Sequence, residues 1–275
     1  VHMLTCSELP DLNEDDSILR TRLLEQGHKV SVNLWNEPVP DGTSVVLIRS
    51  CWDYYKRWDY FIDCIRRIDL KFPIWNTPRI VEWNSDKVYL QRFEDMHIPI
   101  LPTFFPGQRS YLPPEWECDE FVVKPRISNA GNNVVRLPRE SLLTVGVAAA
   151  NFSNKVMIQP FVKEISEVGE YSMIYIGGAY SHCVHKIPGK GDFRVQHMYG
   201  GSYELKEPDA DLQKVAERVQ KHTLEDLVSA RLDFIPYKGQ YCLSEAELIE
   251  PWLHFTEYPQ AADMMIDCLE YRYRH

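Results

Sequence analysis

Three carboxylates in the last fifth of the sequence could bind a metal ion. Two strand-like runs, ARLDFIPY and QYCLSEAELIEP, flank a Lys238-Gly239 turn and contain Asp233, Glu245 and Glu247. Because strand side chains alternate between the two faces of a sheet, Glu245 and Glu247 share one face. Apolar residues surround both, and a buried carboxylate is costly unless it is paired or metal-bound. Oxygen ligands suit magnesium, so both are candidate ligands, although a solvated acidic edge would contain the same residues.

Asp233 is a candidate ligand only under one condition. In a hairpin closed by the two-residue Lys238-Gly239 turn, Asp233 would lie opposite Ser244 and point to the other face. It joins the two glutamates only if the hairpin contains a bulge or a loop with an odd number of residues.

Two lysines lie in segments that could bind phosphate. Lys124 ends the apolar run FVVKP, and a loop rich in Ser, Asn and Gly follows it. Backbone N–H groups of such a loop can bind phosphate oxygens while the lysine supplies positive charge. Lys87 lies in NSDKVYL, in the first turns of a predicted helix. The alternatives are an ordinary strand-ending lysine at 124 and a solvated helix lysine at 87.

A third group of residues follows the predicted strand 45–49. Arg49 closes this apolar strand, and Trp52, Asp53 and Tyr54 come next on a loop. Ligands of open α/β sheets bind at the carboxyl ends of the strands. By charge complementarity, Arg49 favours a carboxylate-bearing group and Asp53 an ammonium, which suits an amino acid or its derivative.

The first third of the chain alternates helices and strands. Apolar periodicity predicts helices over 15–26 and 58–68 and strands over 29–34 and 45–49, an order that favours a small parallel sheet. Residues 76–84 contain Pro78 and are predicted to form a loop. Asn84 or Ser85 would then cap a helix that continues to residue 96.

From Glu120 onward the pattern favours antiparallel sheet. Short strand-like runs alternate with tight turns, including a hairpin that turns at Gly177-Gly178. Two helices are predicted to interrupt the strands, at about 209–229 and after Pro259.

Size and charge limit the possible classes of protein. At 275 residues, the chain is close to the length at which one core divides into lobes. A formal net charge of -10 argues against a nucleic-acid or anionic-membrane partner, which would require a basic face. The seven cysteines form no CxxC pair and are expected to be reduced, mostly buried thiols. Without an apolar run of about 20 residues or a signal-peptide pattern, a cytoplasmic protein is expected, and Val1-His2-Met3 is expected to have no structural role.

Taken in order along the chain, these segments resemble the ATP-grasp superfamily, and within it the branch of glutathione synthetases and D-cycloserine-forming cyclo-ligases. Any one motif is common, but seven in the family order are hard to produce by chance. The resemblance covers nearly the whole chain, through RSCWDY, WNSDKVYL, FVVKP, QPFVKEISEVGEYS, GDFRVQHMYGG, RLDF and EAELIEP.

This resemblance implies an α/β (α+β) ATP-grasp fold, in which two lobes clasp ATP. A Rossmann-like parallel-sheet lobe over 4–82 would carry substrate contacts. A central ATP-grasp lobe over 83–160 would hold the phosphate loop, and a C-terminal ATP-grasp lobe over 161–275 would hold the metal site.

The resemblance also implies roles for single residues. The loop 128–133 would cover the triphosphate and become ordered on ATP binding. Relative to the family, this loop has few glycines, Cys51 stands where threonine is frequent, and Glu247 replaces the asparagine of glutathione synthetases. The implied contacts are Lys87, Lys124, Ser128 and Gly131 to phosphate; Gln159, Phe161 and Val162 to adenine; Glu170, or Glu167, to ribose; Asp233, Glu245 and Glu247 to magnesium; Arg194 and Arg231 to the transferred phosphoryl group; and Arg49, Trp52, Asp53, Tyr54, Gly200 and Gly201 to substrate.

The activity implied by the resemblance is that of an ATP- and Mg²⁺-dependent ligase. It would convert the carboxylate of an amino acid or small peptide-like substrate to an acyl phosphate and join it to an amine. An intramolecular cyclo-ligase or a phosphotransferase could use the same ATP site, and a nucleotide-binding module without turnover is a further alternative. The expected partners are small-molecule carboxylates and amines, with no nucleic acid or membrane, and the chain could be a monomer or a homodimer.

Overall fold

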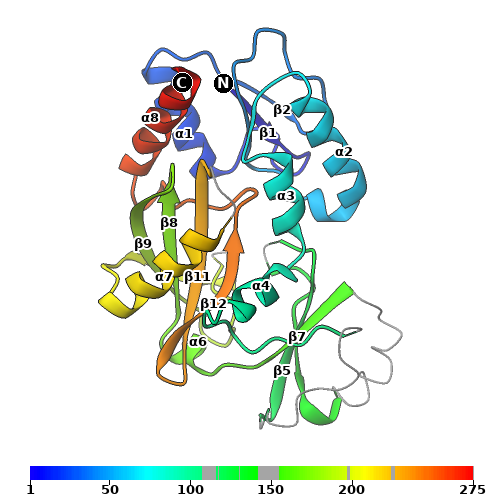
Figure 1. The fold of residues 1–275 in the computed structure, drawn as a ribbon, viewed down its shortest axis with the longest axis vertical. Coiled ribbons are helices and arrows are strands. Elements are labelled where there is room, and N and C mark those ends of the chain that lie inside the picture. The colour runs from blue at the N-terminus through cyan, green and yellow to red at the C-terminus, as the bar shows by residue number, and fades with distance from the viewer. Residues whose placement is uncertain are drawn as a thin grey trace.

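The computed structural model describes residues 1–106, 116, 118–129, 131–141, 155–196, 199–223 and 227–274, which form three sheets (Figure 1). The first sheet is parallel, as predicted, with strand order β2-β1-β3-β4. Its strands are β1 (His2–Thr5), β2 (Ser31–Leu34), β3 (Val46–Ile48) and β4 (Ile74–Trp75). His2 and Met3 are fully buried in β1, so the expectation that Val1-His2-Met3 has no structural role is wrong.

Four helical segments accompany the first sheet, namely α1 (Glu14–Glu25), the 3₁₀ segment η1 (Tyr54–Arg57), α2 (Trp58–Asp69) and α3 (Pro78–Ser85). The predicted loop over 76–84 is wrong, because α3 occupies most of it. Pro78 lies in the first turn of α3, where its missing N–H has no helical acceptor to lose and its fixed φ favours the helix.

The residues after α3 form a shorter helix than predicted. Helix α4 covers only Tyr89–Asp95. Asn84 does not cap it, because the Asn84 side chain donates to the Ala246 carbonyl (2.7 Å) and accepts from the Leu248 N–H (2.9 Å). Asn84 therefore attaches the end of α3 to the end of the β-hairpin that carries the candidate metal ligands.

The second half is antiparallel, as predicted. A three-stranded sheet has the order β6-β5-β7, and a five-stranded sheet has the order β10-β9-β8-β11-β12. Helix α7 ends at His222 rather than near residue 229, since Ser229 already belongs to β11. The elements are β5 (Glu120–Pro125), β6 (Val135–Pro138), β7 (Val156–Pro160), α6 (Glu164–Glu167), β8 (Glu170–Ile176), β9 (Ala179–Ile187), β10 (Ser202–Leu205), α7 (Ala210–His222), β11 (Ser229–Tyr237), β12 (Gln240–Glu247) and α8 (Gln260–Arg274).

The β11–β12 hairpin contains the bulge on which the candidate metal site depends. Its two-residue turn puts Lys238 and Gly239 at positive φ, and Tyr237 pairs with Gln240. Farther from the turn, Phe234 pairs with Leu243 but Asp233 pairs with Glu245, so Ser244 is the extra residue. Because the bulge shifts the register by one residue, Asp233 lies directly opposite Glu245.

The strained turn leads to a stability prediction. Lys238 has a φ of 51°, which lies in the left-handed region of backbone conformation. Most residues with a side chain disfavour this region, and Asn tolerates it better than Lys does. Lys238→Asn is expected to raise the free energy of unfolding in urea by about 0.5 to 1 kcal/mol. The neighbouring exposed variant Gln240→Asn, which starts from ordinary strand geometry, should not show this gain; equal effects of the two changes would contradict the explanation.

One hydrophobic cluster joins the two ends of the chain. Met3 and Leu47 of the parallel sheet and Leu19 of α1 pack in the same buried cluster as Ile174 of β8 and Ile266 of α8. Figure 1 accordingly shows α8 beside α1, next to the parallel sheet. The first lobe and the five-stranded sheet therefore share a core.

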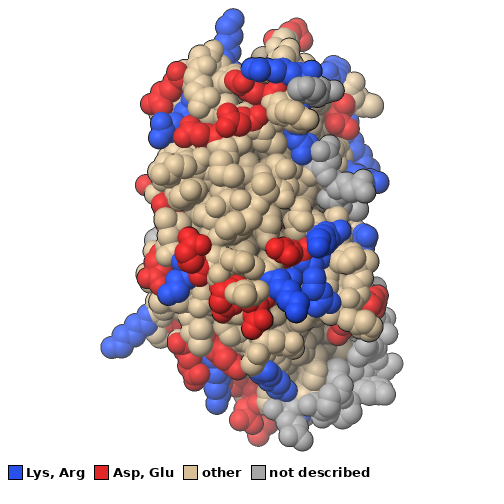
Figure 2. Space-filling model, turned by 60° about the vertical axis from the view of Figure 1, so that its left-hand side comes forward, with Lys and Arg blue, Asp and Glu red and all other residues tan. Residues whose placement is uncertain are grey.

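On the face shown in Figure 2, basic and acidic side chains lie side by side above and below a broad band that carries neither. All seven cysteines are free, five of them buried, in agreement with the prediction of reduced thiols. No helix among the described residues is long and apolar enough to cross a membrane.

Candidate active site

A cavity of about 390 Å³ is lined by residues of the three-stranded sheet, the five-stranded sheet and the first lobe. Segments that are far apart in the sequence meet in this cavity. The predicted site residues that line it are Trp52, Tyr54, Lys87, Lys124, Ser128, Gly131, Gln159, Phe161, Val162, Glu170, Arg194, Arg231, Glu245 and Glu247.

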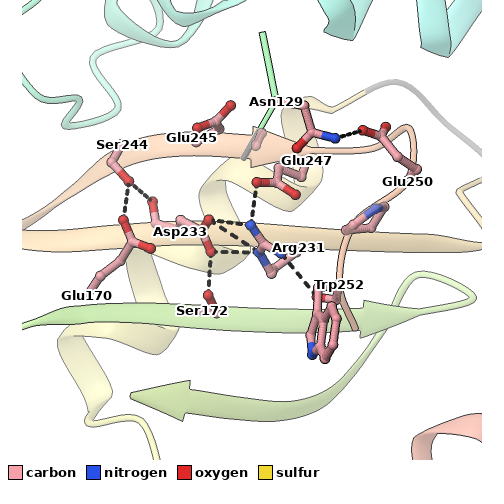
Figure 3. Close-up of polar contacts among 12 residues, drawn as sticks. Asn129, Glu170, Ser172, Arg231, Asp233, Ser244, Glu245, Glu247, Glu250 and Trp252 are labelled. Atoms are coloured by element: carbon pink, nitrogen blue, oxygen red, sulfur yellow. Dashed lines mark hydrogen bonds and ion pairs between the residues drawn. The ribbon is translucent and has the colours of Figure 1, made fainter. Parts of the chain in front are cut away.

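Arg231 joins two of the candidate metal ligands. Its guanidinium lies 3.0 Å from an Asp233 oxygen and forms an ion pair with Glu247 on the next strand (Figure 3). Burial alone would raise the pKa of Asp233, but Arg231 and Lys186 outweigh burial and lower it. Burial raises the pKa of Glu247 to about 7 against the opposing effect of Arg231. Asp233 is thus held as an anion, and an additional cation would stabilise the charged form of Glu247.

Lys186 of β9 balances the charge of Glu170 and also contacts Asp233. Its ammonium is 2.7 Å from Glu170 and 3.3 Å from Asp233, and all three side chains are buried. Ser244, the bulge residue, donates to Glu170 at 3.3 Å and to the Asp233 carbonyl at 3.1 Å. Glu170 therefore faces the cavity with its charge already partly compensated.

The two predicted phosphate lysines differ in their partners. Lys87 is 3.0 Å from Glu245 and donates to the Ser128 carbonyl at 3.1 Å. Lys124 lines the same cavity but takes part in none of the ion pairs found among the described residues. Burial lowers the pKa of Lys124, with Glu245 opposing the shift. Lys124 is therefore the cation in this cavity that an incoming anion would stabilise most.

The candidate metal ligands lie close together but are not a preformed metal site. Within the described ranges, no three His, Cys, Asp or Glu side chains are grouped so that they could hold a metal. Asp233, Glu245 and Glu247 each contact a lysine or an arginine instead. Their oxygen donors fit magnesium, but those contacts must change before a metal can bind.

The predicted adenine hinge lies at the end of β7. Gln159 donates to Thr103 at 2.8 Å, and Val162 packs with Leu101 and Ile235 in a small apolar cluster. Glu170 lines the cavity near this hinge, whereas Glu167 is exposed at the end of α6 and does not line it. The hinge thus has an apolar wall suited to a flat ring.

The segment around Arg194 approaches the predicted phosphate loop. Arg194 forms a 2.7 Å ion pair with Asp192, and its guanidinium lies 3.4 Å from the centre of the Tyr199 ring. A Cβ on Gly131 would be 3.6 Å from the Arg194 side chain, so the loop and this segment are in contact. Ala130, within the predicted loop 128–133, lies outside the described residues.

Gly200 and Gly201 do not line the cavity. Their role in the structure is to let two backbone segments approach each other. A Cβ on Gly201 would lie 2.0 Å from the Val195 carbonyl oxygen, and Val195 does line the cavity. Because Gly201 has no side chain, the backbone at Val195 can lie directly against it, and this close approach helps to position the Arg194 segment.

Two of the four residues predicted to contact substrate from the first lobe are engaged elsewhere. Arg49 is buried, 2.7 Å from Asp16, and donates to the Pro251 carbonyl at 2.9 Å. Asp53 accepts the indole N–H of Trp35 at 2.7 Å. Neither lines the cavity, whereas Trp52 and Tyr54 do.

The family of prokaryotic glutathione synthetase ATP-grasp domains matches residues 86–237, more than half of the chain. This match covers the three-stranded sheet, every strand of the five-stranded sheet except β12, and most of the residues around the cavity. The chain is an ATP-grasp ligase.

The ligase has a second family match. The N-terminal domain of D-cycloserine synthetase DcsG matches residues 1–76, which form the parallel-sheet lobe. The cycloserine biosynthesis protein DcsG of Streptomyces lavendulae is 27% identical over 246 residues, 81% of each chain.

Solved structures show the same fold over nearly the whole ligase. The crystal structure of D-cycloserine synthetase DcsG aligns with a TM-score of 0.84 at 24% identity, over 99% of both chains. The D-alanine–D-alanine ligase of Bacillus anthracis complexed with ATP aligns with a TM-score of 0.71 at 12% identity, over 99% of this chain and 97% of that one.

Three cavity residues of the ligase were missed by sequence reasoning. Lys186 is next to the last residue of β9 and resembles any lysine near a strand end. Glu250 lies within the EAELIEP motif but was given no role, and Trp252 follows that motif. The alternation of side chains along the β8–β9 hairpin could have placed Lys186 beside Glu170, because the two residues are paired across it. Glu250 and Trp252 lie in irregular backbone, where no periodicity indicates which way they point.

A histidine of the cavity gives the ligase a predicted acid sensitivity. His254 is 1% exposed, and burial lowers its pKa to about 3 despite a contact with Glu257. It is neutral in the folded state, so its contribution to stability is complete above the unfolded pKa of about 6.5 and is lost as the pH falls toward 3. Between pH 7 and pH 5 the free energy of unfolding should fall by about 2 kcal/mol from this group.

Urea unfolding of the wild type and of His254→Gln at both pH values measures this contribution. Between pH 7 and pH 5, the free energy of unfolding of the variant should fall by about 2 kcal/mol less than that of the wild type. An unchanged pH dependence in the variant would mean that His254 is not the group responsible.

Proposed function

We propose that this ligase uses ATP and Mg²⁺ to activate a small carboxylate as an acyl phosphate and then joins it to an amine. The substrate would be an amino acid or a small peptide-like molecule. The observation that carries this proposal is Lys124, a half-buried cation that has no ion pair among the described residues, in one cavity with Glu245 and Glu247. A polyphosphate with its metal would supply both the anion and the cation that these groups favour.

The proposed nucleotide contacts follow the walls of the cavity. Lys87 and Lys124 would bind phosphate oxygens, with Ser128 and the backbone at Gly131 from the loop. Adenine would lie against the apolar wall formed by Gln159, Phe161 and Val162, and Glu170 would reach the ribose. The presence of all these residues on one cavity supports this arrangement.

The proposed metal site requires an exchange of ion pairs. Lys87 is now paired with Glu245, and Arg231 with Glu247. If the two cations bind phosphate oxygens, both glutamates become available to magnesium together with Asp233, and no buried charge is left unpaired. Bound magnesium would neutralise charge on the phosphate oxygens.

In the proposed reaction, a substrate carboxylate oxygen attacks the terminal phosphorus, and the bond to the ADP oxygen breaks. Arg194 and Arg231 line the cavity and would stabilise the charge on the transferred group. An amine nitrogen then attacks the acyl carbon, phosphate leaves, and the amine loses a proton. Trp52 and Tyr54 would contact the substrate and exclude water from the acyl phosphate.

A second candidate reaction is intramolecular closure, in which the carboxylate and the amine belong to one molecule. The match of residues 1–76 to the N-terminal domain of D-cycloserine synthetase favours it, because this lobe supplies Trp52 and Tyr54. For either reaction we propose lobe boundaries near residues 82 and 160, between the three sheets.

Magnesium-dependent ADP release tests the proposal. Wild type and Lys124→Ala would be assayed with and without pooled amino acids and small peptides. Stimulation of the wild type alone is the expected result, and the product mass then distinguishes condensation of two molecules, loss of water within one, and phosphate transfer. ATP binding without ADP release in every pool would count against the proposal.

A further inference from the structure

Among the residues that the structure describes, Glu250 is the cavity glutamate without a cationic partner. Glu170 is paired with Lys186, Glu245 with Lys87, and Glu247 with Arg231. No ion pair among the described residues includes Glu250, although it is only 9% exposed. A buried carboxylate without a counter-ion is costly, so this position requires an explanation.

The nearest cations do not neutralise Glu250, because both have other partners. Arg49 is held by Asp16 and by the Pro251 carbonyl, and Lys87 by Glu245 and Ser128. Burial and the charge of Glu247 raise the pKa of Glu250 well above its ordinary value, and Arg49 and Lys87 only reduce the shift. A further cation at this position would therefore be stabilising.

Glu250 is oriented by the predicted phosphate loop. The Asn129 side chain donates to one Glu250 oxygen at 2.7 Å, which fixes the carboxylate at the surface of the cavity (Figure 3). Glu250 therefore lies between the loop proposed to cover the phosphates and the first lobe proposed to hold the substrate.

Aromatic side chains of the first lobe and of the segment after β12 line the same cavity. The rings of Trp52 and Trp252 have centroids 5.9 Å apart, and Tyr54 is buried nearby in the first lobe. Among the described residues, the buried indole nitrogen of Trp252 has no hydrogen-bond partner. These rings form an apolar wall of the cavity, and a carboxylate that lines the same cavity favours a cationic ligand group through charge pairing.

We propose that Glu250 binds the ammonium group of an amino-acid substrate. This inference rests on the proposed function and makes it more specific, because it selects substrates that carry a free ammonium group. It also moves ammonium recognition from Asp53, which is occupied by Trp35, to a residue that lines the cavity. Glu250 is here a specificity-determining residue and takes no part in phosphoryl transfer.

Matched pairs of ligands test this assignment directly. Alanine and serine, each in both chiral forms, would be titrated calorimetrically in the presence of magnesium and a non-hydrolysable ATP analogue, in parallel with lactate and glycerate. The hydroxy acids keep the carboxylate and lack the ammonium. The wild type is expected to prefer the amino acids, and Glu250→Gln should reduce that preference roughly 10- to 100-fold while binding the ATP analogue normally.

Two further variants separate recognition from a structural role. Glu250→Asp retains the charge and should keep part of the preference. Asn129→Ala removes the hydrogen bond but leaves the carboxylate, and should keep the preference for amino acids. Thermal unfolding of each variant shows whether its fold is intact.

Two results would overturn the inference: a wild type with no preference for amino acids over hydroxy acids, or a Glu250→Gln protein that retains the preference. Neither result decides the proposed reaction, which is judged by ADP release and product mass. A Glu250-dependent preference without ADP release would support the ammonium site and count against the ligation reaction. Ligation that does not depend on Glu250 would do the reverse.

Discussion

Replacing Lys124 with methionine is expected to reduce ADP release by about 100- to 1000-fold and at the same time to stabilise the free protein. Lys124 is a half-buried cation that has no ion-pair partner among the described residues, and its partial burial lowers its pKa. Replacing a half-buried charge that lacks a counter-ion with an apolar side chain of similar length should raise the free energy of unfolding by about 1 kcal/mol. Activity would be measured by coupled ADP detection and stability by urea unfolding without nucleotide.

Lys163→Met provides the control for this prediction. Lys163 is exposed and does not line the cavity, so its replacement should change neither activity nor stability appreciably. Magnesium-dependent protection by ATP should also disappear in Lys124→Met, because the phosphate contact is lost. A Lys124→Met protein that is less stable than the wild type, or that releases ADP normally, would contradict the explanation.

Replacing Arg231 with methionine is expected to destabilise the protein by about 3 to 5 kcal/mol, in addition to abolishing turnover. Arg231 contacts Asp233 at 3.0 Å, pairs with Glu247 and donates to the Trp252 carbonyl at 3.1 Å. Its removal leaves the buried Asp233 and the half-buried Glu247 with Lys186 as the remaining nearby cation. The melting temperature and the urea midpoint should both fall, without a change in the urea m-value.

Arg194→Met is the matched comparison, because Arg194 also lines the cavity but pairs with Asp192 nearer the surface. It should lower activity while changing the free energy of unfolding by less than about 0.5 kcal/mol. If both variants lost similar stability, the ion pairs around Arg231 would not be the cause of the loss predicted for Arg231→Met.

The strands and the metal hairpin could be predicted from the sequence because their signals are local. Alternation placed Glu245 and Glu247 on one face, and the Lys238-Gly239 turn indicated the hairpin. The bulge at Ser244 could be stated only as a condition, since no residue in the run requires an extra position. Helix α3 was missed because Pro78 was interpreted as a break, although it lies in the first turn of that helix.

The assignments to substrate were less predictable because they depend on contacts between distant segments. Arg49 lies at the end of a strand, as expected, but its guanidinium already binds Asp16 and the Pro251 carbonyl. Asp53 is similarly occupied by the Trp35 indole. No local sequence pattern shows whether a charged residue has a partner elsewhere in the chain. For the same reason, the sequence did not indicate that Glu250 has no ion pair among the described residues.

The hydrophobic cluster shared by α1, α8 and β8 limits how the molecule can move. Opening a hinge between the parallel sheet and the five-stranded sheet would expose Leu19, Ile174 and Ile266 to water. The three-stranded sheet has a smaller cluster of its own around Phe121 and Ile158. We therefore expect the first and last lobes to behave as one rigid body during turnover, and the three-stranded lobe to be the part that moves when nucleotide enters or leaves.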